Sequence, residues 1–111
     1  ELNITNSQFT GNNGKLSSVM QLSKGDMVSF NANIENKTTN NKKIFIITAV
    51  YDENRLIDYS IKSDTISSGE SRNVTGAQVL VTEDSNSSWS VCGYILDAEK
   101  GFPLGAQYRL K

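Results

Sequence analysis

Apolar and polar residues alternate along one stretch of the chain and run together along another. Between residues 27 and 35, apolar side chains occupy the even positions, whereas the odd positions from Ser29 to Glu35 are polar. A period of two places successive side chains on opposite faces, which predicts a β-strand with one face buried. Residues 44–51 are apolar apart from Thr48. A run of this kind predicts a central strand that is covered on both faces.

Short runs of Asn, Asp, Ser and Gly separate the apolar stretches, and these residues favour turns. No stretch of ten or more residues shows the 3.6-residue period of an amphipathic helix. The pattern predicts about seven strands, at residues 2–9, 27–35, 44–51, 55–62, 73–82, 88–96 and 106–110. This number and spacing are typical of an antiparallel, immunoglobulin-like β-sandwich. We therefore predict that residues 1–111 form one all-β domain.

The strand order also predicts which turns lie together, because alternate connections of an antiparallel sandwich lie at the same end of the molecule. One end should hold the turns at residues 52–54 and 83–87. The other end should hold those at 36–41, 64–70 and 97–101. Polar side chains from turns at opposite ends cannot then combine in one site.

The composition excludes several classes of enzyme. Among its 111 residues the chain has no histidine and one cysteine, Cys92. Without imidazole there is no Ser-His-Asp or Cys-His arrangement and no histidine ligand for a metal, and a single thiol cannot close an intramolecular disulfide. A glycosidase can work with two carboxylates, but a closed sandwich of this length has little surface for the deep cleft that it needs. We expect no catalytic activity, and we expect Cys92 to be a small buried hydrophobe.

Charge and hydropathy limit the partners. The chain has 11 basic and 12 acidic side chains, and its longest basic run is Lys42-Lys43, so we expect no nucleic-acid binding. No apolar stretch approaches the roughly 18 residues of a membrane span, so we expect no membrane insertion.

The chain opens at Glu1 without an initiator methionine or a basic leader. We therefore expect it to be a segment of a larger multimodular protein.

Three blocks of residues occur in a characteristic order between residues 47 and 104. They are Ala49-Val50-Tyr51-Asp52-Glu53-Asn54 with Arg55-Leu56, then Ser68-Gly69-Glu70, then Gly93-Tyr94-Ile95-Leu96-Asp97 with Pro103-Leu104. In these blocks the chain resembles an immunoglobulin-like or fibronectin-III-like accessory module of multimodular extracellular proteins from low-GC Gram-positive bacteria. Clostridial polysaccharide-degrading enzymes and surface proteins carry such modules. The resemblance implies a secreted or cell-surface location and a role other than catalysis.

Two residues depart from the pattern of that family. The turn after Asp52 lacks the usual glycine, so we expect Asn54 to take the left-handed conformation there. Leu96 stands where a tryptophan is common. This second change removes an aromatic side chain from a surface that could otherwise stack on a sugar.

Aromatic side chains are the candidates for ligand binding, because they stack on the apolar face of a sugar ring. The candidates are Tyr51, Tyr94, Trp89 and Phe102, and also Tyr59. Trp89 shares a strand face with apolar residues, so the alternative for it is the central core tryptophan of a sandwich. Tyr51 and Tyr94 are expected on the outer surface of one sheet. The alternative for this pair is cross-strand packing without a ligand.

Carboxylates in two predicted turns are the candidates for a metal site. Asp52, Glu53 and Asp84 could offer oxygen ligands to calcium. The alternative is that they are solvated turn residues, because none of them follows the spacing of a calcium-binding loop. We expect no other cofactor.

Two functions from different classes follow from these observations. The first is a non-catalytic structural and interaction module that spaces or docks neighbouring domains of the same polypeptide. The second is a carbohydrate-binding module that recognises polysaccharide through a sheet face or end loops. A third possibility is that an exposed sheet edge binds a surface protein.

Overall fold

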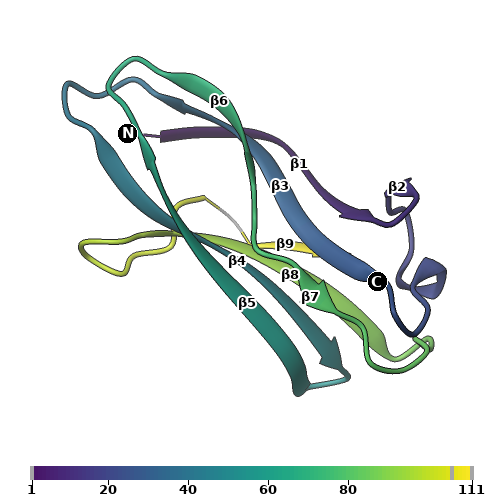
Figure 1. Ribbon diagram of the computed structural model, residues 1–111. Helices are drawn as coiled ribbons and strands as arrows, with labels where there is room; N and C mark the ends of the chain where they lie inside the picture. Colours follow the sequence, from purple (N-terminus) through teal and green to yellow (C-terminus); the bar gives the residue numbers. More distant parts are fainter. Residues whose placement is uncertain (1, 106, 111) are drawn as a thin grey trace.

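The computed structural model describes residues 2–105 and 107–110 and shows an all-β sandwich of two antiparallel sheets (Figure 1). The predicted fold class is confirmed. The strands are β1 (Leu2–Gly11), β2 (Gly14–Lys15), β3 (Met27–Asn36), β4 (Lys42–Asp52), β5 (Arg55–Ile66), β6 (Ser71–Thr75), β7 (Val79–Leu80), β8 (Trp89–Asp97) and β9 (Tyr108–Leu110). A 3-10 turn, η1 (Val19–Gln21), is closed by a capping box of Ser18 and Gln21. No helix among the described residues is long and apolar enough to cross a membrane.

The first sheet has the strand order β2-β1-β3-β6, and β7 also pairs with β3. The second sheet has the order β5-β4-β8-β9. The single strand predicted over residues 73–82 is therefore two strands, because residues 76–78 leave the ladder. Gly76 still donates its N–H to the Phe30 carbonyl, where a Cβ would lie 2.7 Å from that oxygen, but three residues, 76–78, stand opposite the two β3 residues 29 and 30. Of the predicted last strand, residues 108–110 form β9 and residue 106 lies outside the described residues.

Strand β5 is longer than its sequence pattern predicts. It continues past residue 62 to Ile66, since β4 pairs with it from Lys42↔Ile66 to Asp52↔Arg55. The added segment is mostly polar because it borders the open edge of the sandwich. Its hydrophobic pattern is therefore too weak to mark it as a strand.

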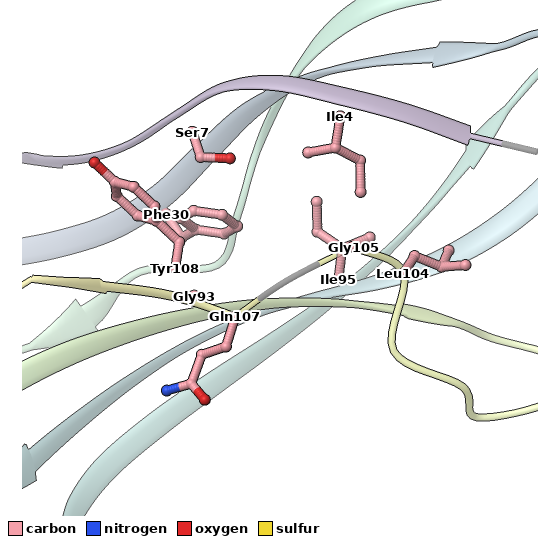
Figure 2. Close-up of a pocket in the computed structure, with 9 residues that line it drawn as sticks. All are labelled: Ile4, Ser7, Phe30, Gly93, Ile95, Leu104, Gly105, Gln107 and Tyr108. Atoms are coloured by element: carbon pink, nitrogen blue, oxygen red, sulfur yellow. The ribbon is translucent and has the colours of Figure 1, made fainter.

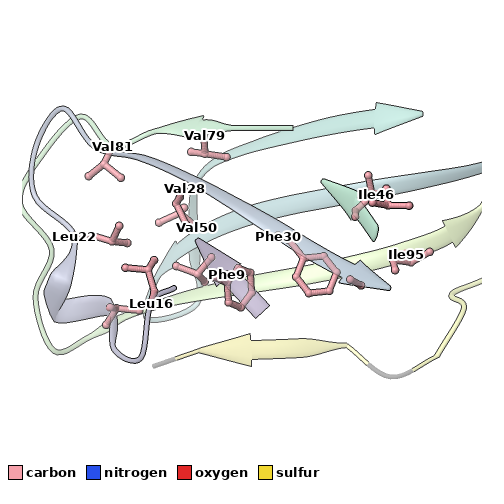
Figure 3. Packing of buried hydrophobic residues seen from close by; sticks show 14 of the residues in the cluster. Phe9, Leu16, Leu22, Val28, Phe30, Ile46, Val50, Val79, Val81 and Ile95 are labelled. Carbon is pink, nitrogen blue, oxygen red and sulfur yellow. The ribbon is translucent and has the colours of Figure 1, made fainter. Parts of the chain in front are cut away.

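The core lies between the two sheets (Figure 3). At its centre the rings of Phe9 and Phe30 stand 5.3 Å apart, and Tyr108 packs 5.4 Å from Phe9. Trp89 is also part of this core, with 2% of its surface exposed. Burial of such aromatic side chains contributes a large share of the stability of a small sandwich.

The predicted grouping of turns at the two ends is confirmed. At one end the N–H of Glu53 donates to the Ser88 carbonyl at 2.8 Å. At the other end the Ser68 hydroxyl donates to the Thr38 carbonyl at 2.6 Å, and the N–H of Ala98 donates to the Lys43 carbonyl at 3.0 Å.

The turn between β4 and β5 differs from the prediction in one detail. Glu53 takes the positive φ of 54°, and Asn54 does not. The pairing Asp52↔Arg55 leaves a two-residue turn, in which the first residue holds the left-handed position. The prediction for Asn54 was wrong because the pairing of the hairpin, and not the preference of the residue, sets which turn position has a positive φ.

Candidate docking surface

The two outer faces of the sandwich have opposite chemical character. On the first sheet, outward positions carry amides and hydroxyls that bond one another. Asn73 donates from Nδ2 to Oδ1 of Asn33 at 2.7 Å, and Asn31 donates from Nδ2 to Oγ1 of Thr10 at 2.9 Å. Most of these polar groups bond one another, although Oδ1 of Asn31 has no partner among the described residues, and the face leaves little apolar surface.

The outer face of the second sheet is apolar and hollowed. A concavity of about 350 Å³ lies over β4, β5 and β8. We name its lining the tyrosine face, which consists of Ile47, Ala49, Tyr51, Leu56, Tyr59, Ile61, Tyr94 and Leu96. The most open of these are Leu56, Tyr59 and Ile61, whose exposed fractions are 45%, 54% and 51%. An apolar concavity that continues across three strands is a candidate binding surface.

Strand register builds this face. Along β4, side chains alternate, so that Ile46 and Val50 are buried in the core while Ile47 and Tyr51 point outward. The pairings Ile47↔Ile61 and Ala49↔Tyr59 add the exposed residues of β5. A register shift between Val50 and Tyr51 then sets Leu56 beside Tyr51.

Tyr51 and Tyr94 come together on this face, as the sequence predicts. Their hydroxyl oxygens are 3.4 Å apart. Burial, followed by the hydrogen bond with Tyr51, raises the pKa of Tyr94 above the usual value of a tyrosine. The Tyr94 phenol therefore stays protonated near pH 7 and can donate and accept hydrogen bonds without carrying charge.

Polar side chains border the tyrosine face on the β9 side. Gln107 donates from Nε2 to Sγ of Cys92 at 3.1 Å. Arg109 pairs with Cys92 across the ladder, and the neighbouring Cys92, Tyr94 and Tyr51 raise the pKa of its guanidinium. Arg109 is exposed, so its cation is available to a partner.

The other two aromatic candidates lie elsewhere. Trp89 is buried in the core, which is the alternative that the sequence left open, and its Nε1 has no hydrogen-bond partner among the described residues. Phe102 lies in the β8–β9 connection, with 63% of its surface exposed and its carbonyl accepting from the N–H of Asp97. The four predicted aromatic residues therefore do not form one site.

The acidic candidates are engaged separately. Asp52 accepts a hydrogen bond from the Ser88 hydroxyl, and its Oδ2 lies 3.6 Å from the Arg55 guanidinium. Asp84 accepts from the N–H of Lys24 at 2.9 Å. Glu53 is exposed in the β4–β5 turn. In residues 2–105 and 107–110, no three Asp, Glu or Cys side chains gather as a group that could hold a metal ion.

A second hollow, of about 240 Å³, opens between the sheets where β1 faces β9. Figure 2 shows Tyr108 pointing toward Phe30 and Ser7 in this hollow, whereas Gln107 points away from it. The ring of Phe30 covers Gly93, where a Cβ would overlap it. The hollow is thus a gap at the margin of the core, lined chiefly by core side chains.

Sequence reasoning missed Leu56, Ile61 and Arg109 as members or neighbours of the site. The first two pair with outward residues of β4, and this follows only once the hairpin register and its bulge are known. The position of Arg109 depends on the pairing of β8 with β9. The short turn at residues 53–54 could have found Leu56, because a two-residue turn opposes Leu56 to Tyr51. It could not have found Ile61, because the bulge shifts the later pairs by one residue.

Known proteins resemble this chain in fold. No protein-family model matches the chain, and no curated protein matches it. Among solved structures, a calcium-binding mutant of Bacteroides uniformis β-glucuronidase 2 superposes with a TM-score of 0.62 at 13% identity, over 93% of this chain and 12% of that one. A β-glucuronidase from glycoside hydrolase family 2 superposes with a TM-score of 0.62 at 17% identity, over 93% of this chain and 10% of that one. At such identities a likeness extends to the fold and not to function. The chain is an antiparallel β-sandwich similar to a segment of about a tenth of two much larger glycosidases.

Proposed function

We propose that this domain is a non-catalytic accessory module of a secreted or cell-surface bacterial protein, and that it docks a neighbouring domain through the tyrosine face. The observation that carries the proposal is the apolar concavity over β4, β5 and β8, in which Leu56, Tyr59 and Ile61 are about half exposed. A domain that functions alone seldom leaves a continuous apolar sheet face open to water.

The comparisons support the same proposal from another side. Nearly the whole chain superposes on a small part of larger proteins, and in those proteins most of the polypeptide lies outside the matching sandwich. Interfaces between domains of one chain resemble protein–protein interfaces with an apolar centre. The tyrosine face has that composition, whereas the opposite sheet face has its amides and hydroxyls bonded to one another.

The test compares the 111-residue chain with the longer polypeptide that contains it. Hydroxyl-radical footprinting measures the accessibility of Tyr59 in both. We expect strong protection in the longer polypeptide, and we expect Ile61→Thr, on the same face, to loosen the docked state and raise the labelling of Tyr59. The control is Asn33→Ser on the polar face, which should change nothing. Equal labelling of Tyr59 in the two proteins would contradict the proposal.

Carbohydrate binding is the second candidate function. Tyr51, Tyr59 and Tyr94 all line the concavity, and phenol rings can stack on sugar rings. Affinity electrophoresis of the 111-residue chain against plant and cell-wall polysaccharides tests it, with retention expected to fall on Tyr59→Thr. Unretarded migration in every polysaccharide gel would remove this candidate.

The absence of catalysis is part of the proposal and has its own test. The acidic candidates Asp52 and Asp84 accept hydrogen bonds from Ser88 and Lys24 and do not share a cleft. We expect no turnover of aryl glycosides by the 111-residue chain. Hydrolysis that disappears on Asp52→Asn would contradict this part of the proposal.

A further inference from the structure

We propose that the surface that docks on the tyrosine face is a protein surface with an apolar centre and carboxylates at its margin, and that Arg109 and Lys43 pair with those carboxylates. This inference rests on the proposed docking function and adds to it the chemistry of the partner. It predicts how the contact depends on salt and on charge reversal.

Two exposed cations lie on the outward side of the second sheet. Lys43 occupies an outward position of β4, in the same alternation as Ile47 and Tyr51. Arg109 occupies an outward position of β9, opposite Cys92 in the ladder with β8. Both side chains are exposed. They therefore mark two margins of the tyrosine face, one toward the start of β4 and one along β9.

The same sheet also carries carboxylates. Within the described strands β4, β5, β8 and β9, no outward position carries Asp or Glu. Asp58 pairs with core-facing Val50, and Asp64 pairs with core-facing Ile44, so both belong to the opposite side of the sheet. The outward positions of these strands thus carry Lys43 and Arg109 but no carboxylate.

A second copy of this chain is not the favoured occupant of the tyrosine face. A twofold contact places the same patch on both sides, so that an apolar centre would meet an apolar centre. Its margins would then present Arg109 and Lys43 without any outward carboxylate among the described residues of the same sheet. Juxtaposed like charges disfavour such a contact, whereas a margin of carboxylates complements it.

The lining of the tyrosine face favours a protein over an anionic polysaccharide. Much of the concavity is aliphatic, formed by Ile47, Leu56 and Ile61. Aliphatic side chains offer no hydrogen bonds to sugar hydroxyls, and desolvating those hydroxyls without partners is costly. Apolar side chains of a protein partner can fill the same space without that cost.

Arg109 is the stronger candidate of the two cations. It lies opposite Cys92 in the ladder between β8 and β9. Arginine forms planar, paired hydrogen bonds with carboxylates, which suits the margin of an interface. Lys43 is a more flexible charge at the other margin and should matter less.

The experiment uses the longer polypeptide that contains this domain and its neighbours. Footprinting of Tyr59 measures the docked fraction in three variants: Arg109→Glu, Lys43→Glu and Ile61→Thr. Ile61 lies beside Tyr59 on the same face. Lys15→Glu, an exposed charge reversal on the other sheet, is the matched control. We expect Arg109→Glu to weaken docking about tenfold, Lys43→Glu to weaken it less, and added salt to weaken it in the wild type more than in Arg109→Glu.

The outcomes separate this inference from the function on which it rests. Suppose that Ile61→Thr opens the contact while Arg109→Glu and Lys43→Glu leave it unchanged. This result would support the docking function and contradict the proposal that the partner has carboxylates at its margin. If Tyr59 is equally labelled in the longer polypeptide and in the 111-residue chain, the docking function itself fails.

Two further measurements address the other occupants. Sedimentation of the 111-residue chain should show a monomer, and a dimer that Ile61→Thr dissociates would overturn the inference in favour of a second copy. Affinity electrophoresis in polygalacturonate should show no retardation. Retardation that Arg109→Glu abolishes, with docking in the longer polypeptide unchanged by that variant, would overturn it in favour of an anionic glycan.

Discussion

At the scale of single residues, a few positions hold the sandwich in its observed geometry. Gly93 lies in β8 directly beneath the ring of Phe30, and Glu53 holds the left-handed position of the β4–β5 turn. Neither role uses the functional group of the side chain. Gly93 is needed for its missing side chain, and Glu53 is tolerated in spite of its side chain.

Gly93→Ala tests the contact with Phe30. The added methyl would overlap the ring, so the core must shift, and overpacking of this kind costs about 1 to 3 kcal/mol of unfolding free energy. Urea denaturation of the 111-residue chain measures the loss. The double variant with Phe30→Leu should lose less than the sum of the two single changes. Additive losses would show that the methyl meets something other than the ring.

Glu53→Gly should stabilise the domain. The positive φ of Glu53 is strained for a residue with a Cβ, and glycine removes that strain at some cost in chain entropy, for a net gain of about 0.5 to 1 kcal/mol. Thermal unfolding of the two proteins measures the difference. Asn54→Gly is the control and should not stabilise, because φ of Asn54 is not positive. The reverse ranking would support the turn geometry that the sequence predicted.

At the scale of elements, the strands at the open edge are joined by an ionic contact across the sandwich. Arg72 of β6 donates to both carboxylate oxygens of Asp64 of β5 at 3.0 Å, and also to Glu70 at 3.2 Å. A paired arginine–carboxylate contact is stronger than a simple surface ion pair. It links the edge strands of the two sheets, which share no backbone ladder.

This contact predicts a pH dependence. The hydrogen bonds with Arg72 hold the pKa of Asp64 below its usual value near 3.8. A lowered pKa contributes stability above the unfolded-state pKa, and this is lost as the pH falls through the folded-state value, hence below about pH 4. Asp64→Asn should therefore lower stability at pH 7 by about 1 kcal/mol or less and flatten the loss between pH 5 and 2.

Urea midpoints measured across that pH range test the prediction for Asp64. The pKa of Asp97 is also lowered, by the backbone N–H groups of Glu99 and Lys100. Asp97 should therefore contribute its own loss of stability in acid, and this loss should remain in the Asp64→Asn variant. An acid limb that is unchanged in Asp64→Asn would mean that the contact with Arg72 contributes nothing to folding.

At the scale of the whole molecule, the sandwich is two-sided. One outer face is a network of amides and hydroxyls, and the other is the tyrosine face. Either kind of outer face is compatible with the same core. The alternation of a strand fixes which residues point inward, and it does not depend on the chemistry of the outward residues. The asymmetry is therefore not imposed by the core, and this is why the proposed function is placed on one face.

Replacing exposed residues of the tyrosine face should separate solubility from stability. In Leu56→Thr with Ile61→Thr, about half-exposed side chains become polar while strand propensity is kept, so the unfolding free energy should change by less than about 1 kcal/mol. Light scattering of concentrated protein should fall. Ile46→Thr, the same chemistry in the core, should lower stability strongly. Unaltered scattering would indicate that the face is not adhesive.

The amino-acid sequence by itself determined the all-β class, the order of most strands and the ends at which the turns lie. These features follow from local stereochemistry, since the period-two pattern and the turn residues act over a few neighbours. Tertiary structure decided the split between β6 and β7, the burial of Trp89 and the register that sets Ile61 beside Ile47. Those outcomes depend on close contacts between residues far apart in the chain, such as Gly76 against Phe30, and a one-residue shift in pairing would exchange the two faces of a strand.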